Sequence, residues 1–121
     1  MGHDVEIVGT NEVLYISGNF SCLNEKYGGI HQFHGHPGKI VAKIIKKTIQ
    51  KANADGFFAS KYDEANIDWG WGVKNGKLMD NQEFIGVFLY HMNNFLKAAE
   101  EYPENVFKSD QVFEVVPYEE N

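Results

Sequence analysis

The sequence predicts a single α+β domain over residues 1–121, with a mainly antiparallel sheet and two helices packed on one face. Three observations favour this class. Two runs of β-branched residues near the N-terminus are typical of a hairpin. Two later segments carry apolar residues at the three- and four-residue spacing of amphipathic helices. The length of 121 residues suits one hydrophobic core, and the chain holds no internal repeat.

The first strands are expected near the N-terminus. Residues 5–9 and residues 13–18 are rich in Val, Ile and Tyr and form the predicted hairpin. Residues 19–29 contain Asn, Ser and a pair of glycines, so a loop is expected there. Residues 30–34 can alternate between two faces, which predicts a third strand.

Two further strands are expected in the second half of the chain. Residues 67–73 alternate strictly, which places Trp69 and Trp71 on one face of a strand. The pair Asn75-Gly76 that follows is a strong signal for a tight turn. Residues 112–116 predict a last short strand before the polar C-terminal end.

The two helices are predicted from apolar periodicity. Pro37 suits the first position of a helix over residues 38–53, whose lysines form the opposite, solvated face. Asp80 and Glu83 resemble a capping box that opens a second helix over residues 81–101. This second helix is apolar on much of its circumference, so we expect surplus apolar surface and a homo-oligomer.

The amino-acid composition limits which binding partners and which cellular compartment are expected. The net charge is −6 and the 11 basic residues are all Lys. Because Arg is preferred for bidentate phosphate and guanine contacts, general nucleic-acid binding is disfavoured. No apolar run is long enough to span a membrane, and no signal pattern opens the chain. Cys22 is the only cysteine, so we expect a reducing, cytoplasmic environment.

The most unusual stretch is residues 31–39, which read His-Gln-Phe-His-Gly-His-Pro-Gly-Lys. One interpretation is an anion-binding turn before a helix, where free backbone amides and the helix dipole attract phosphate. His34, His36 and Lys39 would add donors, and Gly38 would allow a ligand to approach the backbone. The stretch is not a Walker motif, because the glycine spacing and the Lys-Ser/Thr ending are missing.

Two other interpretations of this stretch stay open. His31, His34 and His36 are candidate metal ligands, since neutral imidazole is the commonest protein ligand for zinc and similar ions. On a strand, however, His31 and His34 point to opposite faces. Alternatively, Gly and Pro only shape the turn, and the histidines make structural hydrogen bonds.

Aromatic residues offer a candidate stacking surface. Trp69, Trp71 and Phe57 could form a wall against a nucleotide base, although aromatic residues at strand spacing also commonly pack in a core. No nucleophile-elbow motif is present, and Cys22 has no base beside it in sequence. We therefore expect no catalytic residue and no cofactor.

The turn also carries a resemblance. Residues 34–42 read His-Gly-His-Pro-Gly-Lys-Ile-Val-Ala, and a later apolar helix is followed by Pro103, Val106-Phe107 and Asp110. This pattern resembles a family of small uncharacterised proteins of tailed bacteriophages. The resemblance covers about 80 residues. Ile40 stands where Thr is usual in that family. The resemblance implies a phage or prophage origin and, by analogy of size and context, a counter-defence protein.

The leading hypothesis is a binding protein that sequesters a phosphate-bearing nucleotide signal, cyclic or ADP-ribose-like, as a counter-defence sponge. The first alternative is a metal-dependent nucleotide hydrolase that uses His31, His34 and His36. The second alternative is an acidic protein inhibitor of a host protein, which the net charge of −6 favours.

Overall fold

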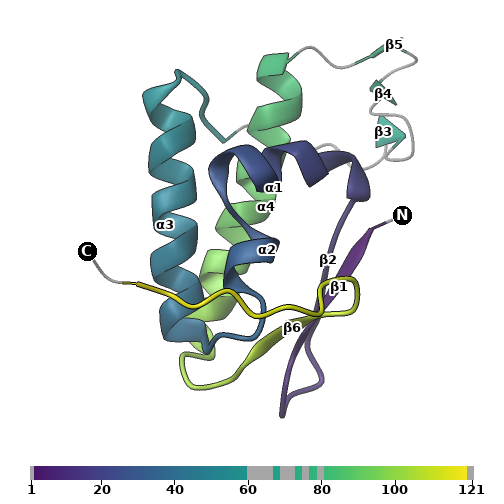
Figure 1. Cartoon of the computed structure of the whole chain (residues 1–121). Helices are drawn as coiled ribbons and strands as arrows, with labels where there is room; N and C mark the ends of the chain where they lie inside the picture. The colour runs from purple at the N-terminus through teal and green to yellow at the C-terminus, as the bar shows by residue number, and fades with distance from the viewer. Residues whose placement is uncertain (1, 60–66, 69–72, 75–76, 79–80, 120–121) are drawn as a thin grey trace.

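The computed structural model describes residues 2–59, 67–68, 73–74, 77–78 and 81–119. It confirms the α+β class, with a three-stranded antiparallel sheet and helices packed against it (Figure 1). The elements are β1 (His3–Ile7), β2 (Val13–Ile16), η1 (Gly18–Phe20), α1 (Ser21–Tyr27), α2 (Ile30–Phe33), α3 (Gly38–Ala54), β3 (Ile67–Asp68), β4 (Val73–Lys74), β5 (Lys77–Leu78), α4 (Asn81–Glu101) and β6 (Phe107–Ser109).

The main sheet has the order β2-β1-β6, and both pairings are antiparallel. The predicted N-terminal hairpin is confirmed, because β1 pairs with β2. Along β1 the side chains alternate as the pleat requires: Val5 and Ile7 are buried, whereas Asp4 and Glu6 are exposed. One face of the sheet therefore meets the helices, and the other face is open to solvent.

Helices α3 and α4 confirm the two predicted helices and lie side by side in opposite directions (Figure 1). Their apolar faces form much of the core, in which Ile45, Phe88 and Phe95 are almost fully buried. Pro37 lies one residue before the first helical position, with extended backbone, rather than at that position. Among the helices in the described part of the chain, none is both long and apolar enough to cross a membrane.

The predictions for residues 19–34 are wrong. Residues 19–29 contain η1 and α1 instead of a loop, and residues 30–34 begin with the short helix α2 instead of a strand. Ile30 and Phe33 are both buried at a spacing of three, which the strand alternation would have placed on opposite faces. Gly29, with a φ of 143°, supports the change of direction between α1 and α2.

The strand predictions for the second half are also corrected. Ile67–Asp68 and Val73–Lys74 are two strands that pair antiparallel, not one continuous strand. The pairing of Lys74 with Lys77 joins β4 to β5 across the predicted tight turn. Trp69, Trp71, Asn75, Gly76 and Asp80 lie outside the described residues.

Residues 112–116 do not form the predicted last strand. The third strand of the main sheet is β6, which ends at Ser109. Residues 112–119 follow it as an extended segment without a strand partner in the described structure, and this segment runs across α2 and α3 (Figure 1). We call residues 112–119 the C-terminal segment.

Candidate functional site

The turn before α3 does not present free amides. The N–H groups of Gly38 and Lys39 donate hydrogen bonds of 2.9 Å to the carbonyl oxygens of Asn105 and Pro103. The positive N-terminal end of α3 thus meets the chain that follows the negative C-terminal end of α4, a favourable arrangement of helix dipoles. The expectation that these two amides are available to a phosphate is therefore wrong.

The same turn closes the outer edge of β6. Gly35 N–H donates to Phe107 O at 2.7 Å, and Phe107 N–H donates to His36 O at 3.0 Å. Ser109 N–H donates to Nδ1 of His34 at 2.8 Å. An uncovered strand edge is a template for unwanted pairing, and here these three hydrogen bonds satisfy it. The geometry thus corresponds to the structural interpretation of the turn.

The remaining polar side chains of the turn are also engaged. Nε2 of His36 lies 2.6 Å from Val116 O in the C-terminal segment. Nζ of Lys39 lies 3.5 Å from the Glu104 carboxylate, with both side chains well exposed. An exposed ion pair of this kind contributes little to stability. The four anion ligands predicted in this turn are His34, His36, Gly38 and Lys39. They lie close together, but each already contacts another part of the chain.

The structure does not bring the three histidines together as ligands of one metal ion. Within the described part of the chain, no group of three His, Cys, Asp or Glu side chains is placed to hold a metal ion. His34 is directed at Ser109 and His36 at Val116. The ring of His31 instead makes an edge contact with the ring of His3, with centroids 5.9 Å apart.

A buried polar cluster around Ser109 was not predicted from the sequence. The Ser109 hydroxyl lies 3.3 Å from Nδ1 of His3 and accepts a hydrogen bond from Gln111 N–H. Ser109 is only 2% exposed, and its hydroxyl is engaged in these contacts. Burial lowers the pKa of His3 and is also the main reason for the lowered pKa of His34. This Ser-His arrangement is structural.

Phe57 does not lie beside the turn. It follows α3 and donates its N–H to Ala52 O, at the opposite end of the helix from Lys39. At a rise of about 1.5 Å per residue, the two ends of α3 are about 25 Å apart. Phe57 lines a separate shallow cavity with Phe58, Gln82 and Glu83. A nucleotide bound at the turn would therefore not stack on Phe57.

The C-terminal segment and α3 enclose a second cavity, which we call the tail groove. Its volume is about 280 Å³. The lining side chains are basic, acidic, aromatic, amide and apolar in character: Gln32, Ile44, Lys47, Lys51, Val116, Pro117, Tyr118 and Glu119. Nζ of Lys47 lies 5.2 Å from the centroid of the Tyr118 ring. Lys47 and Lys51 are one helical turn apart, so their side chains are neighbours on α3.

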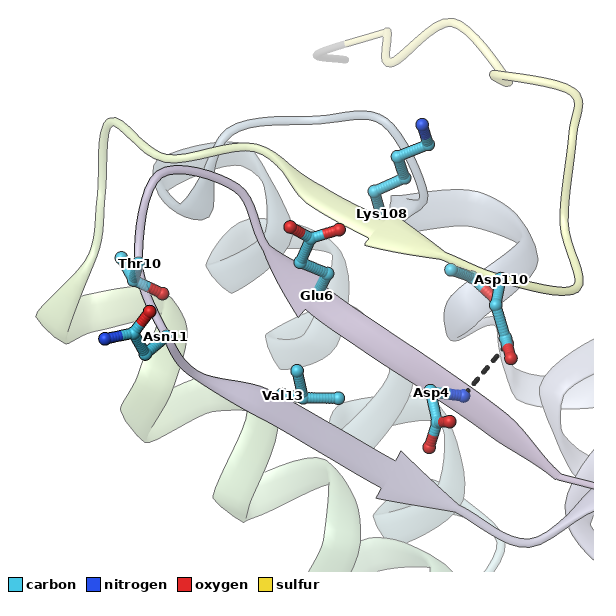
Figure 2. Close-up of a pocket in the computed structure, with 8 residues that line it drawn as sticks. Asp4, Glu6, Thr10, Asn11, Val13, Lys108 and Asp110 are labelled. Atoms are coloured by element: carbon cyan, nitrogen blue, oxygen red, sulfur yellow. Dashed lines mark hydrogen bonds between the residues drawn. The ribbon is translucent and has the colours of Figure 1, made fainter.

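The third cavity lies on the open face of the main sheet, and we call it the sheet-face cavity. Its volume is about 440 Å³, and it is lined by Asp4, Glu6, Thr10, Asn11, Val13, Lys108, Ser109 and Asp110. Figure 2 shows Glu6 and Lys108 on adjacent strands, and Asp4 N–H bonded to the Asp110 carboxylate at 3.0 Å. Three carboxylates beside one lysine make this cavity unfavourable for a phosphate.

Sequence reasoning missed the tail groove because its lining comes from three separate parts of the chain. The lysines of α3 were expected to form a solvated face, and no local motif links Lys47 to Tyr118. The only signal was an aromatic residue in an otherwise polar C-terminal end. Comparison of the chain with protein-family models, with curated protein sequences and with solved structures finds no match.

Proposed function

We propose that this protein captures a phosphate-bearing nucleotide in the tail groove and holds it without changing it chemically. The observation that carries the proposal is the pairing of Lys47 and Lys51 with Tyr118 around one cavity. Lysine ammonium groups make charge-assisted hydrogen bonds to phosphate, and an aromatic ring stacks on a base. A nucleotide contains both of these groups.

The other lining residues fit the same ligand class. The Gln32 amide has both a donor and an acceptor for the edge of a base. The Glu119 carboxylate can accept hydrogen bonds from ribose hydroxyls. Ile44 and Pro117 provide apolar contact area. Polar and charged side chains outnumber apolar ones in this lining, which suits a charged, hydrogen-bonding ligand better than an apolar one.

The biological role that we propose is sequestration of a nucleotide signal, cyclic or ADP-ribose-like, by a phage counter-defence sponge. The support for the phage setting is the resemblance of the turn at residues 34–42 to proteins of tailed bacteriophages. The site differs from the one that the turn suggested, because the amides of Gly38 and Lys39 are engaged with Asn105 and Pro103.

The test combines mass spectrometry and calorimetry on the full chain. Native mass spectrometry of protein taken directly from cells identifies any retained nucleotide. Calorimetry in the presence of a chelator then measures binding of ADP-ribose, a cyclic dinucleotide and AMP. We expect binding of at least one of them and recovery of the unchanged nucleotide afterwards. Absence of binding by all three, or detection of a cleaved product, contradicts the proposal.

The sheet-face cavity supports a second candidate function, an acidic inhibitor that binds a basic host protein. The supporting observation is the group of carboxylates from Asp4, Glu6 and Asp110 around the exposed side chain of Val13. The double variant Asp4→Lys, Glu6→Lys should then lose a partner that the parent protein retains. The matched control is Glu25→Lys, a charge reversal at an exposed position of α1. Equal retention by both variants contradicts this function.

A further inference from the structure

The C-terminal segment is held to the rest of the protein at few points. Among the described residues, its backbone takes part in one hydrogen bond, between Val116 O and Nε2 of His36. Val112 is buried at its start, and Tyr118 lies under Lys47 near its end. Between these points Phe113 is 90% exposed. The segment is therefore anchored by buried Val112 and held beyond it by the Val116–His36 hydrogen bond, by contact of Val115 with Gly35 and by the partly buried ring of Tyr118.

This attachment contrasts with that of the neighbouring strand. Each residue of β6 pairs with β1, and the turn before α3 closes the other edge. Segments with few backbone hydrogen bonds and few buried side chains open at much lower free energy than core elements. We therefore expect residues 113–119 to leave α3 at a lower free energy than β6 needs to leave β1.

The two walls of the tail groove thus differ in how many contacts hold them to the core. Lys47 and Lys51 lie on α3, which is packed in the core, whereas Tyr118 and Glu119 lie on the lightly held segment. A phosphate alone would contact mainly the helix wall. A nucleoside alone would contact the Tyr118 ring but would lack the charged contacts to Lys47 and Lys51. A ligand with both groups contacts both walls.

We propose that the C-terminal segment is a strap that a bound nucleotide fastens onto α3, an inference that rests on the function proposed for the tail groove. The base lies against Tyr118 while the phosphates lie against Lys47 and Lys51, so the ligand bridges the strap and the helix. Binding then includes the cost of ordering the strap, and release requires the strap to open. Ligands that reach only one wall leave the strap free.

Hydrogen exchange measured on the full chain tests this inference. The probe is ADP-ribose, and the two partial probes are pyrophosphate and adenosine. Without ligand, the amides of residues 113–116, 118 and 119 should exchange nearly as fast as those of an unstructured peptide. With saturating ADP-ribose, their exchange should slow by about tenfold or more. Saturation with either partial probe should leave the exchange rate unchanged.

Two variants sharpen the measurement. Tyr118→Ala removes the ring and should abolish the protection, whereas Tyr118→Phe retains the ring and should preserve it. Lys46→Ala, on an exposed position of α3 outside the groove, is the matched control and should behave like the parent chain. Identical protection in Tyr118→Ala and in the parent chain would contradict the bridging role of the ring.

The possible failures are distinguishable. Slow exchange of residues 113–119 in the free chain means that the segment is fixed, and it overturns the strap whatever the ligand does. Calorimetric binding of ADP-ribose without added protection also overturns the strap but leaves the groove as a site. Failure of ADP-ribose, of a cyclic dinucleotide and of AMP to bind, each measured by calorimetry, contradicts the proposed function and the strap together.

Discussion

The backbone N–H of Ser109 donates a 2.8 Å hydrogen bond to Nδ1 of His34, which lies 75 residues earlier in the chain. Both residues are buried, so water cannot readily replace either partner. The bond requires a lone pair on Nδ1, which the neutral ring with its proton on Nε2 provides and the imidazolium ion does not. Protonation of the His34 ring at Nδ1 therefore breaks a hydrogen bond that holds β6 in place.

We expect the free energy of unfolding to fall as the pH drops below 6.5. Burial lowers the pKa of His34, and the charges of Lys108 and His36 act in the same direction. Burial also lowers the pKa of His3, which Asp110 partly offsets. Because the unfolded chain binds these protons more readily, the contribution to stability is complete above the ordinary pKa of 6.5 and is lost below it. Urea titrations on both sides of this pH measure the effect.

Substitutions of His34 separate the hydrogen bond from the titration. His34→Ala leaves the buried Ser109 N–H without an acceptor and should cost about 1–3 kcal/mol of unfolding free energy at neutral pH. His34→Asn offers an amide oxygen close to the position of Nδ1, so it should cost less. It should also flatten the pH dependence, because it does not titrate. If the unfolding free energy of His34→Asn depends on pH as steeply as that of the parent chain, groups other than His34 cause the dependence.

Gly38→Ala should strongly destabilise the fold. A Cβ at this position would collide with the backbone carbonyl oxygens of Tyr102 and Ala99, which cannot move aside as a flexible side chain can. We expect the unfolding free energy of Gly38→Ala to fall by about 3 kcal/mol. The control is Gly56→Ala, where the φ of +91° strains any side chain but no atom lies within 4 Å. This control should cost about 1 kcal/mol. Chemical denaturation of both variants gives the comparison, and equal losses contradict the close approach of α3 and α4.

Lysine substitutions locate the phosphate. Lys47→Ala and Lys51→Ala should each weaken ADP-ribose binding by about 1.5–3 kcal/mol, the range for hydrogen bonds to charged groups. Lys46→Ala and Lys39→Ala should change affinity only slightly, because Lys46 lies outside the groove and Lys39 pairs with Glu104. Calorimetry at constant salt gives the ADP-ribose affinities of the four variants. A larger loss of ADP-ribose affinity in Lys39→Ala than in Lys47→Ala would indicate that the phosphate binds at the turn before α3 instead.

Homo-oligomer formation stays a prediction. It was expected from the broad apolar surface of α4, yet Ile85, Val87, Phe88 and Leu89 are buried within one chain. The exposed apolar residues Val13 and Tyr15 lie instead on β2, the outer strand of the main sheet. Sedimentation at micromolar concentration is expected to show a species larger than 13.8 kDa. A single monomeric species would contradict this expectation, and Tyr15→Lys should weaken any dimer that forms through β2.

The sequence predicted the elements whose pattern is local and long enough to be periodic. Helices α3 and α4 and the β1–β2 hairpin are such elements. Helix α2 has only four residues, too few to distinguish a helical period from an alternation. Residues 112–116 have high strand propensity, but the edge of β6 that could have paired with them is already closed by Gly35 and His36. Propensity does not reveal whether an edge is open.

The candidate site was less predictable than the fold. The turn at residues 34–39 stood out because its composition is unusual, yet its amides and rings are bonded to chain segments about 70 residues later. A single sequence does not indicate these distant acceptors. The tail groove depends on where the C-terminal segment crosses α3, and this placement brings Tyr118 beside Lys47.

The pairing of β1 with β6 has a consequence for how the chain reaches this fold. Strand β1 lies at the centre of the sheet, but its partner Phe107–Ser109 is made about 100 residues later. At the usual rate of protein synthesis, this delay is roughly 5–20 s. The hairpin and helix α3 can form during that interval, but neither the sheet nor the turn before α3 can close. We therefore expect ribosome-bound chains that stop before residue 107 to remain open to proteases, and folding to become cooperative only once β6 has emerged.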